Sequence, residues 1–414
     1  MKILFVHQAF PGQFCHIIDS LGSSGNHQLY GLGIEECKKT LPKKFHYQRY
    51  QPQRSNAAGV HPMALETETK VIRADACAGA ALQLKQQGIK PDLIMSHPGW
   101  GESLFLKDVW PQARLLTYQE FFYHPYGFDL NFDPELQSAN DLGMVCKARM
   151  KNANVLLNLH MSDWCVTPTA FQRSSFPVEY RSRITAIHDG IDTAKAAPNP
   201  TLKGVTLPSG VKLKRGQPVI TFVNRTIEPY RGCHTMIRAI PLIQQLIPNA
   251  QVVIVGAEKG ASYGKRCPDG EWKDHFLKEI EGQYNSNQVH FTGSVPYELY
   301  LQLLQLSTVH IYLTYPFVMS WSLLEAMSSG CTVVGSRTAP VMEVLEDGVN
   351  GRLVDFFSPQ ELSDCVQELV EDRQQAEQLG RTARETILAR YERNHCVQQQ
   401  INLMELVGSG ALSA

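Results

Sequence analysis

The sequence contains no paired cysteines, no long apolar run and almost no net charge, and each absence excludes a class of protein. None of the ten cysteines belongs to a Cys-x-x-Cys pair, which argues against a zinc site and favours reduced thiols in a cytoplasmic protein. No run of about 18 apolar residues occurs, so the sequence predicts no membrane-spanning helix. A formal net charge of −1 provides no global field that would attract nucleic acid.

Three catalytic signatures are also missing. There is no Asp-x-Asp pair to hold a metal ion on a diphosphate, and no Gly-x-Ser-x-Gly elbow of a serine hydrolase. The turn after the first apolar run, FPGQF, has Gly12 alone and lacks the three glycines of a dinucleotide-binding fingerprint.

Short apolar runs alternate with helical patterns along most of the chain. This alternation of strand and helix predicts an α/β fold with parallel sheets that are covered on both faces. The expected strands are Lys2–His7, Leu93–Ser96, Leu115–Tyr118, Val155–Leu159, Cys165–Thr167, Ile184–Ile187, Val219–Val223, Val252–Gly256, Val289–Gly293 and Val309–Thr314. The expected helices of the second half are Cys233–Leu246, Pro296–Leu306, Pro359–Leu379 and Arg381–Tyr391.

A chain of 414 residues suits two domains. We predict a first doubly wound domain over 1–195, and a linker over 196–217, which is rich in Pro, Gly and Lys. A second doubly wound domain is expected over 218–391, with a final helix from about residue 392 to 414 that returns to the first domain. In such folds ligands bind at the carboxyl ends of the strands, which are expected to face one cleft.

The stretch Thr314–Gly335 predicts a strand, a polar turn and a helix that opens at Ser322. The opening turn of a helix presents free N–H groups and a positive dipole end that attract anions. Glu325 lies just inside this turn and is suited to hydroxyl groups of a sugar or ribose. A capping box, in which Glu325 folds back on Ser322, is the structural alternative.

Two arginines follow the first strand of the second domain. Arg225 lies at the end of that strand, and Arg231 precedes the next helix. Two cations across a strand-to-helix loop are suited to a diphosphate, although each on its own is compatible with an ordinary surface charge.

The second half of the chain resembles the retaining family 4 glycosyltransferases of GT-B architecture. The resemblance is carried in order by VNRTIEPYRGCHTMIRAI, VVIVGA, VHFTGSVPYELYLQLLQLSTVHIYLT, SWSLLEAMSSGCTVVGS and APVMEVLEDGVNGRLVDFF. In the first half, VTPTAFQRSSFP and ITAIHDGIDT are similar to the same family.

The resemblance implies roles for individual residues. Arg225 and Arg231 would neutralise the diphosphate of a nucleotide-sugar donor, a UDP- or GDP-sugar, without a metal ion or another cofactor. Glu325 would hold the ribose. The family's other glutamate, which addresses the donor sugar, falls at Phe317 and is absent. Backbone N–H groups could still bind the sugar hydroxyls and phosphate of the nucleotide-sugar donor, and those expected to do so belong to Met319, Ser320, Trp321, Ser322 and Leu323.

The first domain is expected to supply the acceptor side. Gly12 allows the backbone to approach the donor closely. His97, Glu120 and His124 follow predicted strand ends and are candidates to orient an acceptor hydroxyl. For each of them a hydrogen-bonded structural role is the alternative.

The segment Lys38–Arg54 has six basic residues and no acidic residue. It is either a solvated loop or a patch for anionic lipid headgroups or a phosphorylated acceptor, possibilities that composition leaves open.

We therefore predict a cytoplasmic, metal-independent retaining glycosyltransferase, peripheral at the inner membrane face if the basic patch binds lipid. It would move a sugar from a nucleotide donor to a glycan or lipid-linked acceptor in cell-surface polysaccharide synthesis, with no nucleic-acid partner. The alternatives are a GT-B-type epimerase or phosphorylase and a non-catalytic sugar-nucleotide-binding protein.

Overall fold

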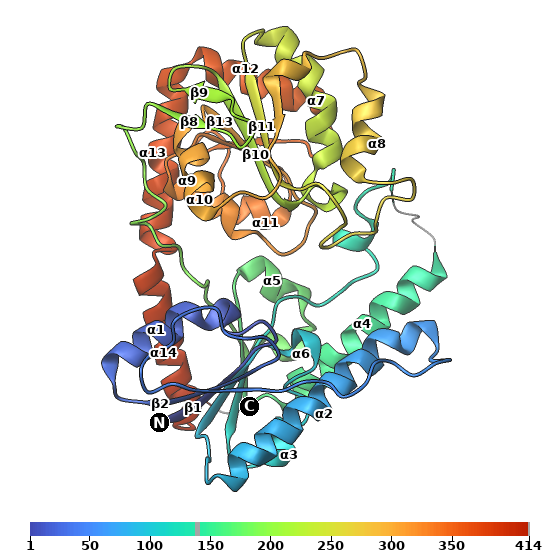
Figure 1. Ribbon diagram of the computed structural model, residues 1–414, viewed down its shortest axis with the longest axis vertical. Coiled ribbons are helices and arrows are strands. Elements are labelled where there is room, and N and C mark those ends of the chain that lie inside the picture. The colour runs from blue at the N-terminus through green and yellow to red at the C-terminus, as the bar shows by residue number, and fades with distance from the viewer. Residues whose placement is uncertain (137–140, 413–414) are drawn as a thin grey trace. The chain divides into compact units, whose positions relative to one another are not determined.

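The computed structural model describes residues 1–136 and 141–412. Contacts within the chain divide it into two compact units (Figure 1). Unit 1 comprises Met1–Gly190 and Arg393–Ala414, and unit 2 comprises Ile191–Glu392.

Unit 1 is built on a seven-stranded sheet in the order β3-β2-β1-β4-β5-β6-β7, in which every pairing is parallel. Its strands are β1 (Lys2–Val6), β2 (Gln28–Gly33), β3 (His46–Arg49), β4 (Leu93–Ser96), β5 (Arg114–Tyr118), β6 (Trp164–Thr167) and β7 (Ile184–Ala186). Its helices are α1 (Cys15–Ser24), α2 (Leu65–Gln86), α3 (Leu106–Val109), α4 (Leu142–Met161), α5 (Ala170–Ser175), α6 (Val178–Arg181) and α14 (Arg393–Gly408). The final helix α14 packs beside α1 and contacts β4 and β5 (Figure 1).

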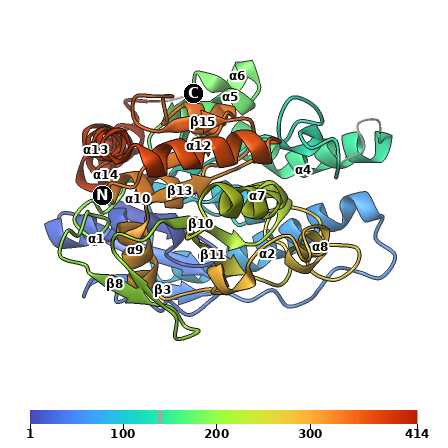
Figure 2. The ribbon, with the colours of Figure 1, turned by 90° about the horizontal axis from the view of Figure 1, so that it is seen from above.

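Unit 2 contains a six-stranded parallel sheet in the order β12-β11-β10-β13-β14-β15. Its strands are β10 (Val219–Thr226), β11 (Gln251–Ala257), β12 (Val289–Phe291), β13 (Val309–Tyr312), β14 (Val333–Ser336) and β15 (Arg352–Val354). Its helices are α7 (Cys233–Leu246), α8 (Trp272–Glu279), α9 (Tyr297–Leu306), α10 (Trp321–Ser328), α11 (Ala339–Met342), α12 (Pro359–Glu371) and α13 (Arg373–Arg390). Helices α7 and α12 lie side by side (Figure 2).

In each sheet the strands that follow the first strand in the sequence are added first on one side of it and then on the other. In unit 1 the chain leaves β1 for β2 on one side and reaches β4 on the other, and in unit 2 β10 lies between β11 and β13. Ligands of doubly wound folds bind at the carboxyl ends of the strands that flank such a switch point. The segments after β1, β4, β10 and β13 are therefore the places to look for a site.

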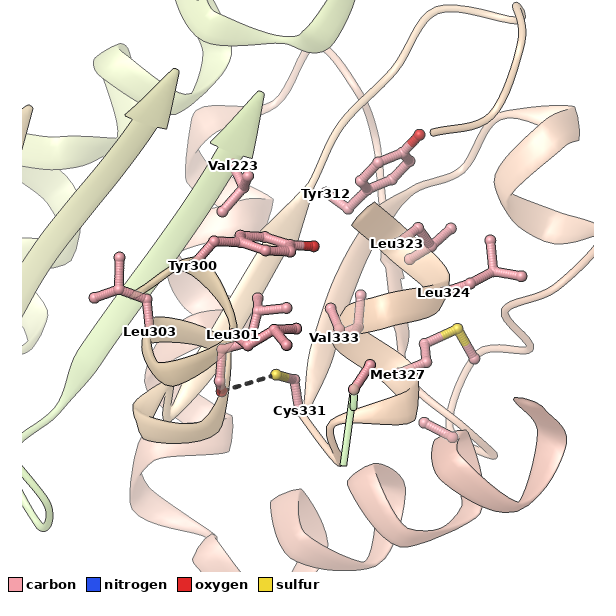
Figure 3. Close-up of a cluster of buried hydrophobic side chains, with 14 of the residues drawn as sticks. Val223, Tyr300, Leu301, Leu303, Tyr312, Leu323, Leu324, Met327, Cys331 and Val333 are labelled. Atoms are coloured by element: carbon pink, nitrogen blue, oxygen red, sulfur yellow. Dashed lines mark hydrogen bonds between the residues drawn. The ribbon is translucent and has the colours of Figure 1, made fainter. Parts of the chain in front are cut away.

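The core of unit 2 explains why α9 and α10 are fixed against the sheet. Tyr300 of α9, Tyr312 of β13 and Leu323 of α10 belong to one buried cluster (Figure 3). The thiol of Cys331 donates to the Leu304 carbonyl at 3.1 Å in the same region. Dense apolar packing of this kind holds the polar groups at the edge of the cluster in fixed positions.

One predicted strand is wrong. Val155–Leu159 lies inside helix α4. Val155, Asn158 and Leu159 are buried, whereas Leu156 and Leu157 are exposed. This is the spacing of a helix face, and a short apolar run does not by itself distinguish it from a buried strand.

The segment predicted as a linker contains structure of its own. Within 196–217, β8 (Gly204–Thr206) and β9 (Lys212–Lys214) form an antiparallel pair. Val205, Leu207 and Leu213 are buried in the core of unit 2. This segment is therefore part of that unit, and the unit boundary lies at Gly190, several residues before the predicted linker begins.

Candidate functional site

Arg231 is a buried cation at the carboxyl edge of the sheet in unit 2. It ends the 3-10 turn η5 (Pro229–Arg231), and only 4% of its surface is exposed. Its Nη1 donates to the hydroxyls of Tyr312 at 3.2 Å and Thr314 at 2.7 Å, and its Nη2 donates to the Val318 carbonyl at 2.9 Å. These acceptors are neutral, and no carboxylate of the described residues forms an ion pair with Arg231.

Burying a charge without a counterion costs free energy unless another group neutralises it. An anionic ligand at Arg231 would therefore be stabilised by a cation that is already desolvated and held in place by three hydrogen bonds.

Tyr312 connects Arg231 to the start of helix α10. Its hydroxyl accepts from Arg231 and also from the N–H of Ser320 at 2.8 Å. Ser320 is the N-cap of α10, and its side chain accepts from the N–H of Ser322 at 3.3 Å. One phenol thus joins the guanidinium to the start of the helix, and both the guanidinium and the positive end of the helix dipole favour an anion.

The backbone donors predicted on Met319–Leu323 are fewer than the sequence suggested. The N–H groups of Ser320 and Ser322 have the partners just described, and the N–H of Leu323 donates to the Ser320 carbonyl at 3.3 Å. The side chains of Met319 and Leu323 are buried in the core. The half-buried Trp321 packs against the same core.

Glu325 does not form the capping box that was the structural alternative. The helix begins at Trp321, one residue earlier than predicted, and Ser320 caps it. The two carboxylate oxygens of Glu325 instead accept from the hydroxyls of Tyr297 at 2.7 Å and Tyr300 at 2.9 Å on α9. Burial raises the pKa of Glu325 above its ordinary value, although these hydrogen bonds act in the opposite direction.

Arg225 is an exposed residue near the end of β10. No hydrogen bond or ion pair joins its side chain to Arg231 or to any other residue in the described ranges. The joint binding of a diphosphate by the two arginines therefore remains a prediction. Of the two, only Arg231 has described contacts at the carboxyl edge of the sheet.

A second buried ionisable side chain, that of Glu228, was not singled out from the sequence. It is fully buried, and its carboxylate accepts from three successive N–H groups, those of Ser262 at 3.0 Å, Tyr263 at 3.1 Å and Gly264 at 3.0 Å. Glu228 thus fixes the loop between β11 and α8. Only its place between Arg225 and Arg231 could have drawn attention to it.

Unit 1 brings the predicted residues Gly12, His97 and Glu120 together, and it adds His7, which the sequence analysis did not single out. His97 follows β4, Glu120 follows β5, and His7 follows β1. His7 Nε2 lies 2.7 Å from Gln13 Oε1, the Gln13 amide donates to Glu120 at 3.2 Å, and His97 Nε2 lies 3.6 Å from the same Glu120 oxygen. Gly12 belongs to this group, because a Cβ added to it would meet the His7 ring at 2.3 Å.

The protonation of this cluster follows from its contacts. His97 Nδ1 accepts from the Gly99 N–H at 3.2 Å, so the neutral ring carries its proton on Nε2, which faces Glu120. Burial alone would raise the pKa of Glu120, but His97, His7 and Gln13 together lower it. Burial, reinforced by His97, lowers the pKa of His7 to about 4.

His124 is not part of this cluster. Its Nε2 lies 2.6 Å from the carbonyl oxygen of Ser175, and its ring stacks on Phe128 at 4.5 Å. These contacts give it a structural role next to helix α5, and they leave Glu120 and His97 as the grouped acceptor-side candidates.

Other expectations concern the surface and the thiols. Of the basic residues in Lys38–Arg54, Arg49 pairs with Glu36 at 3.1 Å and Arg54 with Glu68 at 3.0 Å, so the segment is partly neutralised. None of the ten cysteines, all of which lie in the described ranges, forms a disulfide. Within the described ranges, no helix has the length and apolar character needed to cross a bilayer. No group of three His, Cys, Asp or Glu side chains suited to a metal was found there either.

Two family models match the chain and together span most of it. Residues 26–196 match the glycosyl transferase family 4 group, and residues 208–386 match the glycosyl transferases group 1. An uncharacterised glycosyltransferase of Methanocaldococcus jannaschii is 27% identical over 188 residues, which are 45% of this chain and 44% of that protein. The alignments span 31% to 61% of the first three curated relatives.

Solved structures share the fold over the whole chain. Sucrose-phosphate synthase of Thermosynechococcus elongatus has a TM-score of 0.73 at 14% identity and covers 99% of this chain and 100% of that one. HepE of Anabaena in complex with UDP-glucose has a TM-score of 0.65 at 17% identity and covers 98% and 99%. With its two parallel-sheet units of GT-B type and both family matches, this chain belongs to the family 4, group 1 glycosyltransferases.

Proposed function

We propose that the protein is a retaining glycosyltransferase that moves a sugar from a nucleotide-diphosphate donor to a hydroxyl of a glycan or lipid-linked acceptor, in the synthesis of a cell-surface polysaccharide. One observation carries the donor class: Arg231 is buried without a carboxylate partner among the described residues and is joined through Tyr312 to the start of α10. A diphosphate supplies the charge that this position lacks.

The same residues account for catalysis. As the bond between the sugar and the diphosphate breaks, negative charge grows on the leaving phosphate. A guanidinium fixed by three hydrogen bonds needs no reorganisation to stabilise this charge. Glu325, held by Tyr297 and Tyr300 on α9, would accept hydrogen bonds from the ribose hydroxyls.

In unit 1, Glu120 is the candidate to orient the acceptor hydroxyl. Its side chain is 39% exposed, whereas His97 beside it is buried. Gln13 holds one carboxylate oxygen through a hydrogen bond, and the carboxylate would accept from an incoming hydroxyl.

Arg231→Met tests the donor assignment by isothermal titration calorimetry with UDP, GDP, ADP and their glucose conjugates. Loss of a charge-assisted contact is expected to weaken binding of the preferred donor about 10- to 100-fold. Because the variant removes a buried unneutralised charge and also the donor of three buried hydrogen bonds, urea denaturation must first verify that it is folded. Arg352→Met, which removes a surface cation paired with Glu368, is the control.

A folded Arg231→Met variant that binds the donor like the wild type would remove Arg231 from the site. Product analysis then separates the remaining alternatives. Transfer needs an acceptor, whereas an epimerase converts the donor alone and a phosphorylase requires inorganic phosphate.

A further inference from the structure

Phe317 stands where the family resemblance places a carboxylate that addresses the donor sugar. Its ring is buried, with 6% of the residue exposed. The ring contacts Tyr230 edge-on at 5.6 Å between centroids and Tyr263 at the same distance and an angle of 63°. The region next to Val318, whose carbonyl accepts from Arg231, is therefore aromatic.

Tyr263 is the exposed member of this aromatic group. Its residue is 39% exposed, and its ring lies 4.8 Å from the Arg231 guanidinium carbon. The Arg231 guanidinium thus covers one face of the Tyr263 ring, and the Phe317 ring contacts the Tyr263 ring from a second direction. The exposed part of the ring remains accessible to a ligand bound at Arg231.

The position of Tyr263 is built into the fold. Glu228 accepts from its N–H and from those of both neighbours. The hydroxyl of Ser262 lies 2.6 Å from that of Thr226 at the end of β10, and the indole of Trp272 donates to the Lys265 carbonyl at 2.9 Å. These hydrogen bonds hold the loop that carries Tyr263 in place. The ring is therefore preorganised for a ligand.

We propose that Tyr263 is the donor-sugar contact of this chain and that its ring, backed by Phe317, replaces the missing carboxylate with an apolar wall. This inference rests on the proposed function. Past the phosphate at Arg231, the next group of the donor is its sugar, and the apolar C–H face of a pyranose packs on an aromatic ring. Tyrosine gives such contact area at a low cost in side-chain entropy.

This wall has a consequence for specificity. A buried carboxylate that bonds a sugar hydroxyl strongly rejects analogues without that hydroxyl, because the carboxylate is then left unpaired. An apolar ring has no such penalty. The protein is therefore expected to accept a donor that lacks one sugar hydroxyl, such as a deoxy sugar, with an affinity within a few-fold of the parent compound.

The test compares a nucleotide sugar with the matching nucleoside diphosphate, using the pair that wild-type protein prefers among those containing UDP, GDP and ADP. Tyr263→Leu should weaken the nucleotide sugar about tenfold and leave the diphosphate within about twofold. Tyr263→Phe keeps the ring and should bind both like the wild type. Tyr284→Leu, on another surface of unit 2, is the matched control.

Any different outcome of these titrations contradicts the proposal. Equal losses for both ligands would show that the ring serves the diphosphate or the base, and no loss for either would show that it contacts no donor. Wild-type protein that binds none of these ligands would instead remove the proposed function itself. Because Tyr263 is exposed, Tyr263→Leu should fold, which far-ultraviolet circular dichroism verifies.

Discussion

Gly12 has a φ of 52°, and the imidazole of His7 occupies the space that a Cβ would take, at 2.3 Å. Its absent side chain therefore serves two purposes. It permits a left-handed turn directly after β1, and it leaves room for the ring that holds Gln13 against Glu120.

Gly12→Ala should lower the free energy of unfolding by about 2 to 4 kcal/mol, because strain at positive φ and a clash with His7 add together. Gly25 separates the two effects. It also has a positive φ, of 68°, but nothing lies within 4 Å of an added Cβ, so Gly25→Ala should cost only about 1 kcal/mol. Urea denaturation measures both, and equal losses would show that the His7 ring moves aside without cost.

The sequence predicted the residue types of the site better than their partners. Arg231 and Glu325 were found from spacing within short segments. The partner of Arg231, Tyr312, lies 81 residues away along the chain, and the tyrosines of Glu325 lie on another helix. Such pairs depend on how the strands are ordered in the sheet, which local patterns do not specify. Glu228 and Tyr263 were missed for the same reason.

At the scale of elements, one helix with an apolar stripe was predicted well, whereas the break between α12 and α13 was placed near residue 380 and lies at Asp372. Cys233–Leu246 was predicted with the bounds that α7 has, since its apolar residues recur at helical spacing. Strand β2 was missed because QLYGLG contains two glycines, which disfavour strands. Its burial comes from the neighbours β1 and β3, so tertiary context overrides propensity there.

The pairing of α9 with α10 through Glu325 makes stability depend on pH. Burial raises the pKa of Glu325 above 4.5 in the folded chain, so the folded state binds the proton more tightly than the unfolded state. Between pH 4.5 and the raised pKa, the stability contributed by this group therefore falls as pH rises. Glu325→Gln should gain stability relative to the wild type as pH increases through that window.

Urea denaturation over a pH series measures this difference, with Glu377→Gln on the surface of α13 as control. A parallel difference at every pH would contradict the assignment. Donor titration on the same variant tests the ribose contact, because a purely structural Glu325 would leave donor affinity unchanged.

At the scale of the whole molecule, unit 1 is formed from two separate parts of the chain. Helix α14 contributes five apolar side chains to the core of unit 1, those of Val397, Ile401, Leu403, Met404 and Val407. At about 2 kcal/mol for each buried side chain, the helix contributes about 10 kcal/mol, which is comparable to the total stability of a typical domain.

Truncation after Glu392 should therefore unfold unit 1 and leave unit 2 folded. Hydrogen exchange read by mass spectrometry should show lost protection in β1 and β5 and retained protection in β10 and β13. Unit 2 serves as the internal reference, and protected β1 amides in the truncated chain would contradict the assignment of α14.

The two ends of unit 2 are neighbours: the N–H of Ile191 donates to the Tyr391 carbonyl at 2.8 Å, and Ile191 forms a β-bridge with Glu392. Residues 191–392 thus form a unit that is inserted into unit 1, and the two ends of the insertion lie next to each other. The segment 191–392 could therefore be exchanged for the matching segment of a relative without adding linker residues at either junction. Such a chimaera should have the donor preference of the relative that supplied 191–392 and the acceptor preference of the protein that supplied unit 1.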